Sequence, residues 1–492
     1  MRCLLGIDVG TTGTKTLLFR QDGKLLGQSY CSYNTQTPGV GRCEQNPDDW
    51  WQAVVKTVRE VCADGKTAAA VAAIALSTQG GTMVPVDQNG RPVRPAIVWN
   101  DIRCAAEQAA FRQELGADTL YQKTGWALEP SQNLMQIRWM KDHEPELFEK
   151  TAYFLSVPDY IAYRMTGIMA IDPSNMGINQ LGNIRAGAYD PQLLAFAGIR
   201  EEQLPKIQPS GTPIGKLIPV AAAELGLSES VLLVAGAHDQ YAVALGAGAC
   251  QKDDILIGTG TCWVVTRISD RADFASGLSQ SVAAAPGLWG SLCALSSGGV
   301  CLDWLRKNIL SDGAGEGIGY EQLGREVACR AAAKDGLFFY PFTGFAADGT
   351  FFKKGTFSGM DLSHDKYHLA RAVMEGVAYQ ILWMLECFQA QPQALRLTGG
   401  AVKSRLWCQM VADMSGLPVK IPETADLGCV GAAILAGIGS GIYGDAQQGY
   451  ARMAIREETI LPDPSQSTMY RRQEKLYRQL AGQLLPMTYL FQ

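Results

Sequence analysis

A run of glycine, threonine and lysine residues near the N-terminus has the composition of a phosphate-binding loop. In the segment Asp8-Val-Gly-Thr-Thr-Gly-Thr-Lys15, the glycines let backbone N–H groups approach an anion, and the hydroxyls of Thr11, Thr12 and Thr14 add donors. Lys15 adds a positive charge. The spacing is not that of a Walker A loop, because Thr14 separates the last glycine from the lysine. A phosphate cradle is one interpretation, and an ordinary hairpin turn with a solvated Asp8 is the other.

A second loop of the same kind, without a lysine, lies in the other half of the chain. It consists of Gly258, Thr259, Gly260 and Thr261. Two such loops, one in each domain, can hold a polyphosphate from the two sides of a cleft. The pair therefore strengthens the phosphate interpretation of both.

The acid Asp239 follows an apolar strand predicted at Val231–Val234, within the segment Gly236-Ala-His-Asp-Gln240. A carboxylate beside a phosphate loop can accept a proton from a hydroxyl or bind Mg²⁺. The alternative is that Asp239 caps the N-terminus of a helix.

An aromatic ring and planar polar groups follow another apolar strand, in the segment Val98-Trp-Asn-Asp-Ile-Arg103. Polyhydroxylated ligands are held by such groups. A solvated loop between a strand and a helix is the alternative.

Two further segments combine glycine or histidine with a predicted helix. Leu397-Thr-Gly-Gly-Ala401, followed by Ser404, predicts a strand, a tight turn and a helix N-terminus, where a ribose or phosphate can bind. His364 and His368 have the spacing of two zinc ligands on a helix, but the glutamate of a zinc-protease motif and a third ligand are missing. We therefore expect no metal at these histidines.

The elements that must position these groups follow from the apolar pattern. Three short apolar runs separated by turns predict an antiparallel meander, and helix and strand patterns then alternate as in an α/β protein with mixed sheets. The predicted elements are strands at Leu4–Val9, Lys15–Phe19, Leu25–Tyr33, Val71–Ser77, Val84–Val86 and Ile97–Trp99, and helices at Asp49–Cys62, Tyr367–Gln389, Leu406–Ser415, Val430–Ile438 and Thr468–Gln483.

The opening hairpin has a counterpart in the middle of the chain. Ile255–Val265 repeats the plan of Leu4–Thr14, an apolar strand that runs into a Gly/Thr turn and out into a second strand. The repeat predicts two similar domains with a boundary near Ala247–Gln251, that is, domains 1–247 and 248–492.

Composition excludes several classes of protein. The chain has 492 residues with 43 Lys plus Arg against 48 Asp plus Glu, a net charge of −5, and contains no long basic run that would attract nucleic acid or an anionic membrane. Its 53 glycines are an excess that suggests tight turns and close approach of backbone to ligand. The 13 cysteines include no C-x-x-C pair, and no apolar run is long enough for a signal peptide or a membrane span. We expect a cytoplasmic protein with reduced thiols and with neither nucleic acid nor membrane as a partner.

Taken together, the motifs resemble those of the FGGY family of carbohydrate kinases, in the same order and over nearly the whole chain. The segments that carry the resemblance are Gly6–Thr12, Glu44–Trp51, Pro95–Arg103, Gly236–Gln240, Ile257–Gly260, and Leu397–Ala401 with Ala432 and Ala433. The resemblance implies two ribonuclease-H-like domains of the actin and hexokinase type, hinged around a cleft.

The resemblance also implies roles for single residues. Asp239 matches the catalytic base that removes a proton from the sugar hydroxyl, and Asp8 matches the acid that positions Mg²⁺, with Asp239 as a second metal ligand. The other matched positions are Thr11, Thr12, Thr14 and Lys15 in the first phosphate loop, Gly258, Thr259, Gly260 and Thr261 in the second, Gly399, Gly400 and Ser404 at the adenosine, and Gln79, Trp99, Asn100, Asp101 and Gln240 at the sugar.

The sequence departs from the family pattern in two places. Xylulose kinases carry Gly-Gln-Met-His-Gly where this chain has Ser77-Thr-Gln-Gly-Gly81, so Gly80 and Gly81 replace a methionine and a histidine. Either the sugar is larger, or another segment fills the space. In addition, Pro341-Phe-Thr-Gly344 is followed by Phe-Ala-Ala and not by the usual Glu-Arg.

The resemblance predicts an ATP- and Mg²⁺-dependent kinase of a small sugar or polyol, with a ketopentose such as D-xylulose as the substrate. Other polyols, aldonates and deoxy sugars are alternatives within the family, and a homodimer is one option for the assembly. An ATP-driven clamp without sugar kinase activity is the alternative from a different class. A DNA-binding sugar sensor is disfavoured, because no basic helix-turn-helix precedes the first loop.

Overall fold

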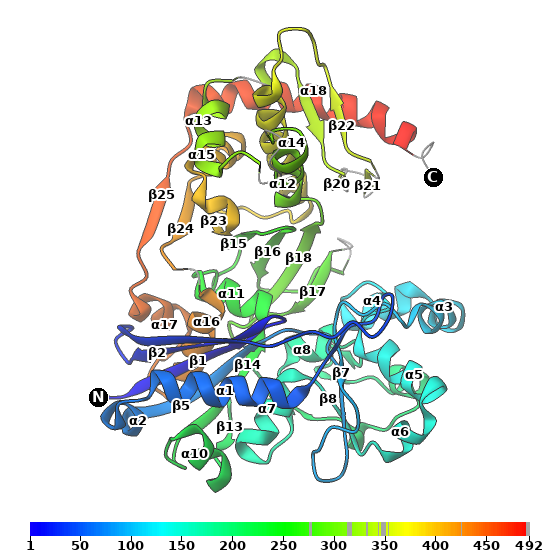
Figure 1. The fold of residues 1–492 in the computed structure, drawn as a ribbon, viewed down its shortest axis with the longest axis vertical. Coiled ribbons are helices and arrows are strands. Elements are labelled where there is room, and N and C mark those ends of the chain that lie inside the picture. Colours follow the sequence, from blue (N-terminus) through cyan, green and yellow to red (C-terminus); the bar gives the residue numbers. More distant parts are fainter. Residues whose placement is uncertain are drawn as a thin grey trace. The chain divides into compact units, whose positions relative to one another are not determined.

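The chain forms two compact units, each of which collects more than one stretch of sequence (Figure 1). Unit 1 consists of Met1–Lys252, Ile268–Ser291 and Asp426–Ile455, and unit 2 of Asp253–Arg267, Leu292–Ala425 and Arg456–Gln492. The computed structural model describes residues 1–274, 278–311, 317–330, 333–342, 344–345, 351–352, 354–424 and 426–488. None of the helices in these ranges is both long and apolar enough to cross a membrane.

Unit 1 is built on a mixed sheet with the strand order β13-β14-β5-β1-β2-β3. The strands are β1 (Cys3–Val9), β2 (Gly13–Arg20), β3 (Leu25–Ser32), β5 (Val71–Thr78), β13 (Pro213–Lys216) and β14 (Leu232–His238). The meander predicted for the first three strands is confirmed: β1 pairs antiparallel with β2, and β2 with β3. β1 and β14 pair parallel with β5, and β13 pairs antiparallel with β14.

The remaining elements in the first half of the chain are short strands and helices. The strands are β4 (Glu44–Gln45), β6 (Val84–Val86), β7 (Ala96–Ile97), β8 (Tyr153–Leu155), β9 (Ala170–Ile171), β10 (Gly182–Asn183), β11 (Ala188–Tyr189) and β12 (Lys206–Ile207). The helices are α1 (Pro47–Val61), α2 (Gly65–Ala70), α3 (Ala105–Glu114), α4 (Ala117–Thr124), α5 (Asn133–His143), α6 (Pro145–Lys150), α7 (Val157–Thr166), α8 (Pro173–Ile178), α9 (Pro191–Ala197), α10 (Pro219–Leu225) and α11 (Asp239–Gly246). Unit 1 further contains β17 (Ser279–Val282), α16 (Leu427–Gly439) and α17 (Ala446–Met453).

The second sheet repeats this plan, with neighbouring strands in the order β18-β16-β15-β23-β24-β25. These strands are β15 (Ile255–Thr259), β16 (Trp263–Ser269), β18 (Trp289–Leu295), β23 (Leu395–Gly399), β24 (Val419–Pro422) and β25 (Glu457–Ile460). β15 pairs antiparallel with β16 and parallel with β23, β23 pairs parallel with β24, and β24 antiparallel with β25. The sequence of pairings matches that of the first sheet, which confirms the predicted duplicated α/β architecture with mixed sheets.

The helices of unit 2 are α12 (Gly299–Asn308), α13 (Tyr320–Ala328), α14 (Lys366–Cys387), α15 (Arg405–Ser415) and α18 (Pro464–Thr488). Among its described residues are also the short strands β19 (Phe338–Tyr340), β20 (Gly344–Phe345), β21 (Phe351–Phe352) and β22 (Thr356–Ser358). The altered Pro341–Gly344 motif falls partly outside the described residues, because these omit Thr343 and 346–350.

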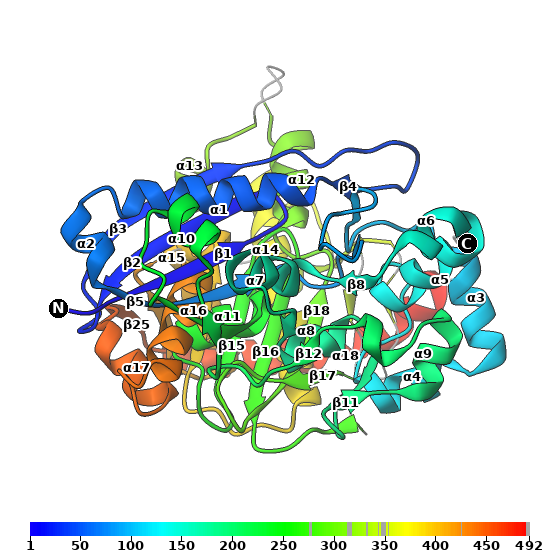
Figure 2. The ribbon, with the colours of Figure 1, turned by 90° about the horizontal axis from the view of Figure 1, so that it is seen from below.

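Helices cover both faces of the first sheet, and the alternation of β1 decides which residue faces which helix. Cys3, Leu5, Ile7 and Val9 join the buried cluster that includes Trp50, Trp51, Val54 and Val58 of α1. Figure 2 shows α1 lying along the sheet. The alternate residues, among them Gly6 and Asp8, face the other way, toward α16.

α16 is a late segment of the chain that packs against β1, β5 and α11 (Figure 1, orange beside blue). Its contacts are backbone to backbone, because glycines stand at the crossings. A Cβ on Gly6 would overlap the carbonyl of Cys429, and one on Gly431 would overlap that of Ala242. Glycine at these positions lets α16 lie directly on the strand that carries Asp8.

Candidate active site

The first predicted phosphate loop is the turn between β1 and β2, closed by a hydrogen bond from Gly10 N–H to Gly13 O (3.1 Å). Side chains bind three of its carbonyl oxygens: Tyr33 Oη donates to Gly10 O (2.5 Å), Gln45 Nε2 to Thr11 O (2.6 Å) and Tyr30 Oη to Thr12 O (3.2 Å). In a trans peptide the C=O and the following N–H point in opposite directions, so fixing the carbonyls aims the N–H groups the other way. The turn is therefore held by side chains on its carbonyl side, and its backbone N–H groups point away from those side chains.

Asp8 is not the solvated acid of the alternative interpretation. It lies inside β1, accepts a hydrogen bond from Ser77 Oγ (2.5 Å), and is directly opposite Lys15 in the β1–β2 register. Burial is the main reason that the pKa of Asp8 is raised to about 6, and the nearby carboxylates of Asp239 and Asp426 raise it further. A half-buried carboxylate beside other acids is costly to keep ionised, which is typical of a site that binds a cation.

Lys15 forms an ion pair with Asp426, the residue just before α16. Its side chain is 36% exposed. The predicted phosphate ligand therefore has a carboxylate partner in this structure, contributed by a segment far along the chain.

Asp239 is the first residue of α11, and His238, not Asp239, occupies the N-cap position. The capping alternative for Asp239 is therefore wrong. Its Oδ1 is buried and makes no hydrogen bond within the described part of the chain, although His238 Nε2 lies 3.3 Å away. Gln240 follows it in the first turn and is half-buried. A carboxylate at a helix N-terminus gains from the helix dipole and keeps its lone pairs available.

A chain of hydrogen bonds joins the first loop to two predicted sugar ligands. Trp99 Nε1 donates to Thr11 Oγ1 (2.9 Å), and Thr11 Oγ1 donates to Gln79 Oε1 (3.1 Å). Gln79 Nε2 donates in turn to Gln45 Oε1 (3.1 Å). The Thr11 hydroxyl, predicted to add a donor toward phosphate, gives its one proton to Gln79 here.

The other predicted loop residues differ in exposure. Thr12 is exposed, whereas Thr14 is fully buried within β2. Asn100 is exposed beside Trp99, but Asp101 is fully buried. The carboxylate of Asp101 accepts bonds from Cys43 N–H (2.6 Å) and from the Arg103 guanidinium (2.7 Å). In this structure Asp101 holds the loop together and does not face an open space.

Other segments fill the space left by Gly80 and Gly81. A Cβ added to Gly80 would lie 2.6 Å from His238 Cδ2 and 2.7 Å from Ile178 Cγ2. Gly81 has a φ of +67° and lies against the side-chain oxygen of Gln132, so a Cβ there would meet both strain and overlap. The contacts around Gly80 and Gly81 therefore match the explanation that other segments of the chain, and not a larger sugar, fill the space of the missing side chains.

In unit 2 a cavity of about 840 Å³ brings together the second predicted phosphate loop and the predicted adenosine segment. Its lining includes the predicted residues Thr259, Gly260, Thr261, Gly400 and Ser404. Gly258 and Gly399 do not line it: Gly258 lies within β15, and Gly399, with a φ of +98°, makes the turn out of β23. A cavity of this size with an apolar wall suits a small-molecule ligand.

Hydrogen bonds fix the shape of this cavity. Thr259 Oγ1 donates to Thr398 O (2.6 Å) and accepts from Ala401 N–H (3.1 Å), which ties the loop to the turn after β23. Gly299 N–H, at the start of α12, donates to Gly260 O (3.2 Å). Ser404 Oγ caps α15 by accepting from Trp407 N–H (3.3 Å). The threonine and serine hydroxyls therefore act first as supports of the turn.

Sequence reasoning missed the wall contributed by two helices. The unpredicted lining residues include Gly299, Val300, Leu302 and Asp303 of α12 and Tyr320, Leu323, Gly324, Arg325 and Ala328 of α13. The run Ser296-Ser-Gly-Gly299 before α12 is a glycine-rich turn into a helix and could have signalled the first of these. No comparable signal precedes α13.

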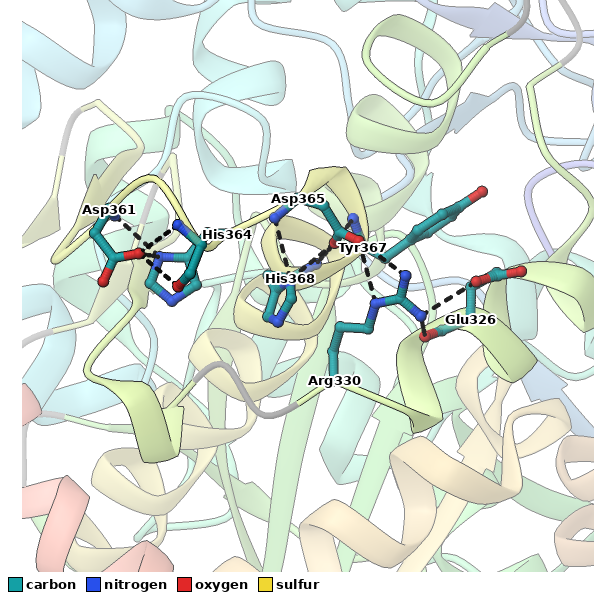
Figure 3. A network of polar contacts seen from close by, with 8 residues as sticks. Glu326, Arg330, Asp361, His364, Asp365, Tyr367 and His368 are labelled. Carbon is teal, nitrogen blue, oxygen red and sulfur yellow. Dashed lines mark hydrogen bonds and ion pairs between the residues drawn. The ribbon is translucent and has the colours of Figure 1, made fainter.

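The two histidines with zinc-ligand spacing are held in the turns that start α14 (Figure 3). His364 Nδ1 accepts from Asp361 N–H (3.0 Å), and His368 Nδ1 accepts from Asp365 N–H (3.1 Å). Asp365 in turn caps α14 and pairs with Arg330. Each histidine accepts from the aspartate three residues before it, so the four-residue spacing of the histidines reflects two consecutive turns of the same kind.

Comparison with known proteins agrees with the motifs. The xylulose kinase and the gluconokinase of Bacillus subtilis (strain 168) are each 28% identical to this chain; the first match covers 98% of this chain and 97% of the relative, the second 88% and 86%. The crystal structure of xylulose kinase from Rhodospirillum rubrum superposes with a TM-score of 0.92 at 28% identity, over 99% of this chain and 100% of that one.

Two family models match in sequence order. The N-terminal domain of the FGGY family of carbohydrate kinases matches residues 3–246, and its C-terminal domain matches residues 254–440. Because these matches together span most of the sequence, the chain belongs to the FGGY family of carbohydrate kinases.

Proposed function

We propose that this carbohydrate kinase transfers the γ-phosphoryl group of ATP to a hydroxyl of a small sugar, and that the acceptor is a ketopentose such as D-xylulose. The observation that carries the proposal is the carboxylate of Asp239 at the start of α11. Its Oδ1 is buried and unbonded within the described residues, and Asp8 lies close enough to feel its charge. Membership of a kinase family does not support the clamp alternative.

The proposed reaction is an in-line displacement at phosphorus. The Asp239 carboxylate accepts the proton of the acceptor hydroxyl while the hydroxyl oxygen forms a bond to the γ-phosphorus, and the bond to the bridging oxygen breaks with its electron pair leaving on ADP. The transition state is loose, so the base acts late and most of the rate comes from positioning and charge neutralisation. Mutation of such a base costs about 10²- to 10⁴-fold.

ATP is proposed to use the cavity of unit 2 for its nucleoside part. The apolar side chains of Leu302, Leu323 and Met374 suit a base, and the glycines at 260, 299 and 400 leave backbone open toward a ribose or phosphate. The fixed turn between β1 and β2, with Thr12 exposed and Lys15 nearby, is proposed as the first phosphate loop.

Magnesium is proposed to bind at Asp8 with Asp239. Within the described ranges no group of three or more His, Cys, Asp or Glu side chains is placed to hold a metal ion. Mg²⁺ needs no such group, because it is usually bound by one or two carboxylates together with substrate phosphates and water. The unbonded Oδ1 of Asp239 and the nearby Asp8 carboxylate fit that donor set. When bound, the ion neutralises phosphate charge.

The test of the base is the variant Asp239→Asn in the full-length protein. We expect sugar phosphorylation in a coupled ADP assay to fall by about 10²- to 10⁴-fold, while calorimetry shows unchanged ADP binding. Asp118→Asn, an exposed position in α4, is the matched control. Turnover of the Asp239 variant within a fewfold of the wild type would contradict the assignment.

The acceptor is tested with a panel of ketoses, polyols, aldonates and deoxy sugars, scored by acceptor-dependent ADP release. D-xylulose is expected to give the highest kcat/KM. A higher value for an aldonate or a deoxy sugar would replace the ketopentose but keep the kinase, and a flat response across the panel would contradict sugar phosphorylation itself.

A further inference from the structure

His238 occupies the volume that a side chain at position 80 would take. The Gly80 backbone has no left-handed φ, so the absence of a side chain there is not a demand of the backbone. A Cβ would lie 2.6 Å from Cδ2 and 2.9 Å from Nε2 of His238. Glycine at 80 and histidine at 238 are therefore complementary, and the ring enters the site beside the proposed base.

The position of the His238 ring is fixed from several sides. The residue ends β14 and is 5% exposed, and its N–H donates to Ser174 Oγ (2.9 Å). Its ring lies edge-on to Trp126, with centroids 6.2 Å apart and planes at 88°, and against Tyr241 at 5.9 Å. A ring held in this way can discriminate between ligands, because its polar atoms cannot move to suit each of them.

Polar atoms around this ring are buried without partners. His238 Nδ1, Trp126 Nε1 and Gln132 Oε1 make no hydrogen bond within the described residues. Each such atom destabilises the folded protein if it stays unbonded. Gln132 Oε1 faces Gly81, whereas the Cδ2–Nε2 edge of His238 faces Gly80 and leaves Nδ1 on another side of the ring. A ligand with several hydroxyls, each a donor and an acceptor, would satisfy them.

The charges in the same region disfavour an anionic acceptor. Asp239 and Asp8 are both acids, and they lie within electrostatic reach of each other. Four basic residues of the neighbouring segments are each paired with a carboxylate: Lys15 with Asp426, Arg103 with Asp101, Lys123 with Asp190 and Arg138 with Asp142. A carboxylate on the acceptor would meet acids and uncharged groups.

We propose that His238 is the specificity-determining residue of the acceptor site, that its Nδ1 bonds a hydroxyl of the acceptor, and that the acceptor is an uncharged polyhydroxylated molecule and not an aldonate. The inference rests on the proposed function, because it concerns the same site. It narrows the choice left by relatives that act on xylulose and on gluconate.

Three substitutions of His238 separate the roles of its two nitrogens. Asn places a polar atom near the position of Nδ1, Gln places one near Nε2, and Phe keeps a ring without either. If Nδ1 bonds the acceptor, His238→Phe and His238→Gln raise the KM for D-xylulose about 10- to 100-fold with little change in kcat, and His238→Asn stays within about fivefold of the wild type. Calorimetric binding of D-xylulose should follow the same order.

The control is His143→Asn, a histidine of α5 that is 49% exposed and should leave both constants unchanged. The proposal would be overturned if kcat fell in His238→Phe and His238→Asn but stayed near the wild-type value in His238→Gln. That result would mean that Nε2 orients Asp239. Near-ultraviolet circular dichroism identifies a variant that has lost its fold. The other two variants then show which nitrogen of His238 bonds the acceptor.

The charge part of the proposal is tested with D-xylulose, xylitol and gluconate on the wild-type protein. We expect kcat/KM for gluconate to be at least about 100-fold below that for the better neutral acceptor. Equal or better use of gluconate would overturn it. Absence of ADP release with every acceptor would overturn the proposed function as well, whereas normal turnover that His238→Phe leaves unchanged would overturn this inference alone.

Discussion

At the scale of single residues, the raised pKa of Asp8 lowers the free energy of unfolding at neutral pH. A carboxyl with a pKa of about 6 in the folded protein and about 3.9 in the unfolded chain binds its proton more tightly when folded. The resulting stabilisation is complete below pH 3.9 and is lost as the pH rises through 6. One pKa unit corresponds to about 1.4 kcal/mol, so the loss approaches about 3 kcal/mol above pH 7.

Asp8→Asn should therefore stabilise the ligand-free protein at pH 7.5 by up to about 3 kcal/mol, and by much less at pH 4.5. The asparagine can still accept the Ser77 hydrogen bond, and it carries no charge to bury. Thermal unfolding midpoints at the two pH values measure the effect, with Asp118→Asn as the exposed control. A gain of equal size at both pH values would show that the effect does not come from the ionisation of Asp8.

Residue types and spacing predicted where Asp8 and Asp239 lie in their elements, since strand ends and Gly/Thr turns are local features. They did not predict that Thr11 donates to Gln79 or that Asp101 is enclosed by Arg103 and Cys43. Those bonds join segments that meet only in the folded chain, and a polar side chain in a loop has the same appearance in the sequence whether it faces ligand or protein.

At the scale of elements, the crossing of α11 and α16 depends on glycine. Gly431 stands where a Cβ would overlap the backbone of Ala242, and Gly246 stands against Leu427 in the same way. α16 thereby lies close to β1, which carries Asp8, and to α11, which begins with Asp239. The two helix backbones can approach this closely because the glycines have no Cβ atom.

Gly431→Ala should lower the free energy of unfolding by about 1–3 kcal/mol, because the added methyl group forces the helices apart. Gly482→Ala, an exposed position in α18 with open space around it, should be neutral or stabilising by up to about 1 kcal/mol. Urea denaturation midpoints compare the two. Equal effects of the two substitutions would mean that helix propensity alone determines the change in stability, and that the helix crossing does not contribute.

The apolar period predicted the course of most elements well. α14, α15 and the meander lie within a few residues of their predicted ranges, because each contains a run of apolar residues bounded by polar or turn residues. α16 was predicted as a helix, but its association with the first sheet was not. Eleven of its thirteen residues are buried, so no face distinguishes one partner from another.

At the scale of the whole molecule, unit 1 draws on a stretch near the C-terminal end, Asp426–Ile455. The predicted division into domains 1–247 and 248–492 stays a prediction. The folding of the isolated fragment 1–247 tests it. Residues 1–247 alone would lack α16, and with it the cover over Gly6 and Asp8 on β1.

We expect the fragment 1–247 to be poorly soluble, to bind hydrophobic dyes and to lack a near-ultraviolet circular dichroism spectrum, because a large apolar face is left open. The same fragment joined to residues 426–455 should recover a cooperative unfolding transition. A cooperative transition of 1–247 alone would show that the first domain is complete without the late segment.

The late arrival of α16 also has a consequence for how the protein is made. A ribosome adds about 5–20 residues per second, so the first sheet waits roughly ten to forty seconds between the synthesis of Lys252 and that of Ile455. During that interval the strand with Asp8 emerges without its cover. Nascent chains of this protein should therefore depend on a holding chaperone, and slowing translation within residues 253–425 should lower the yield of folded enzyme.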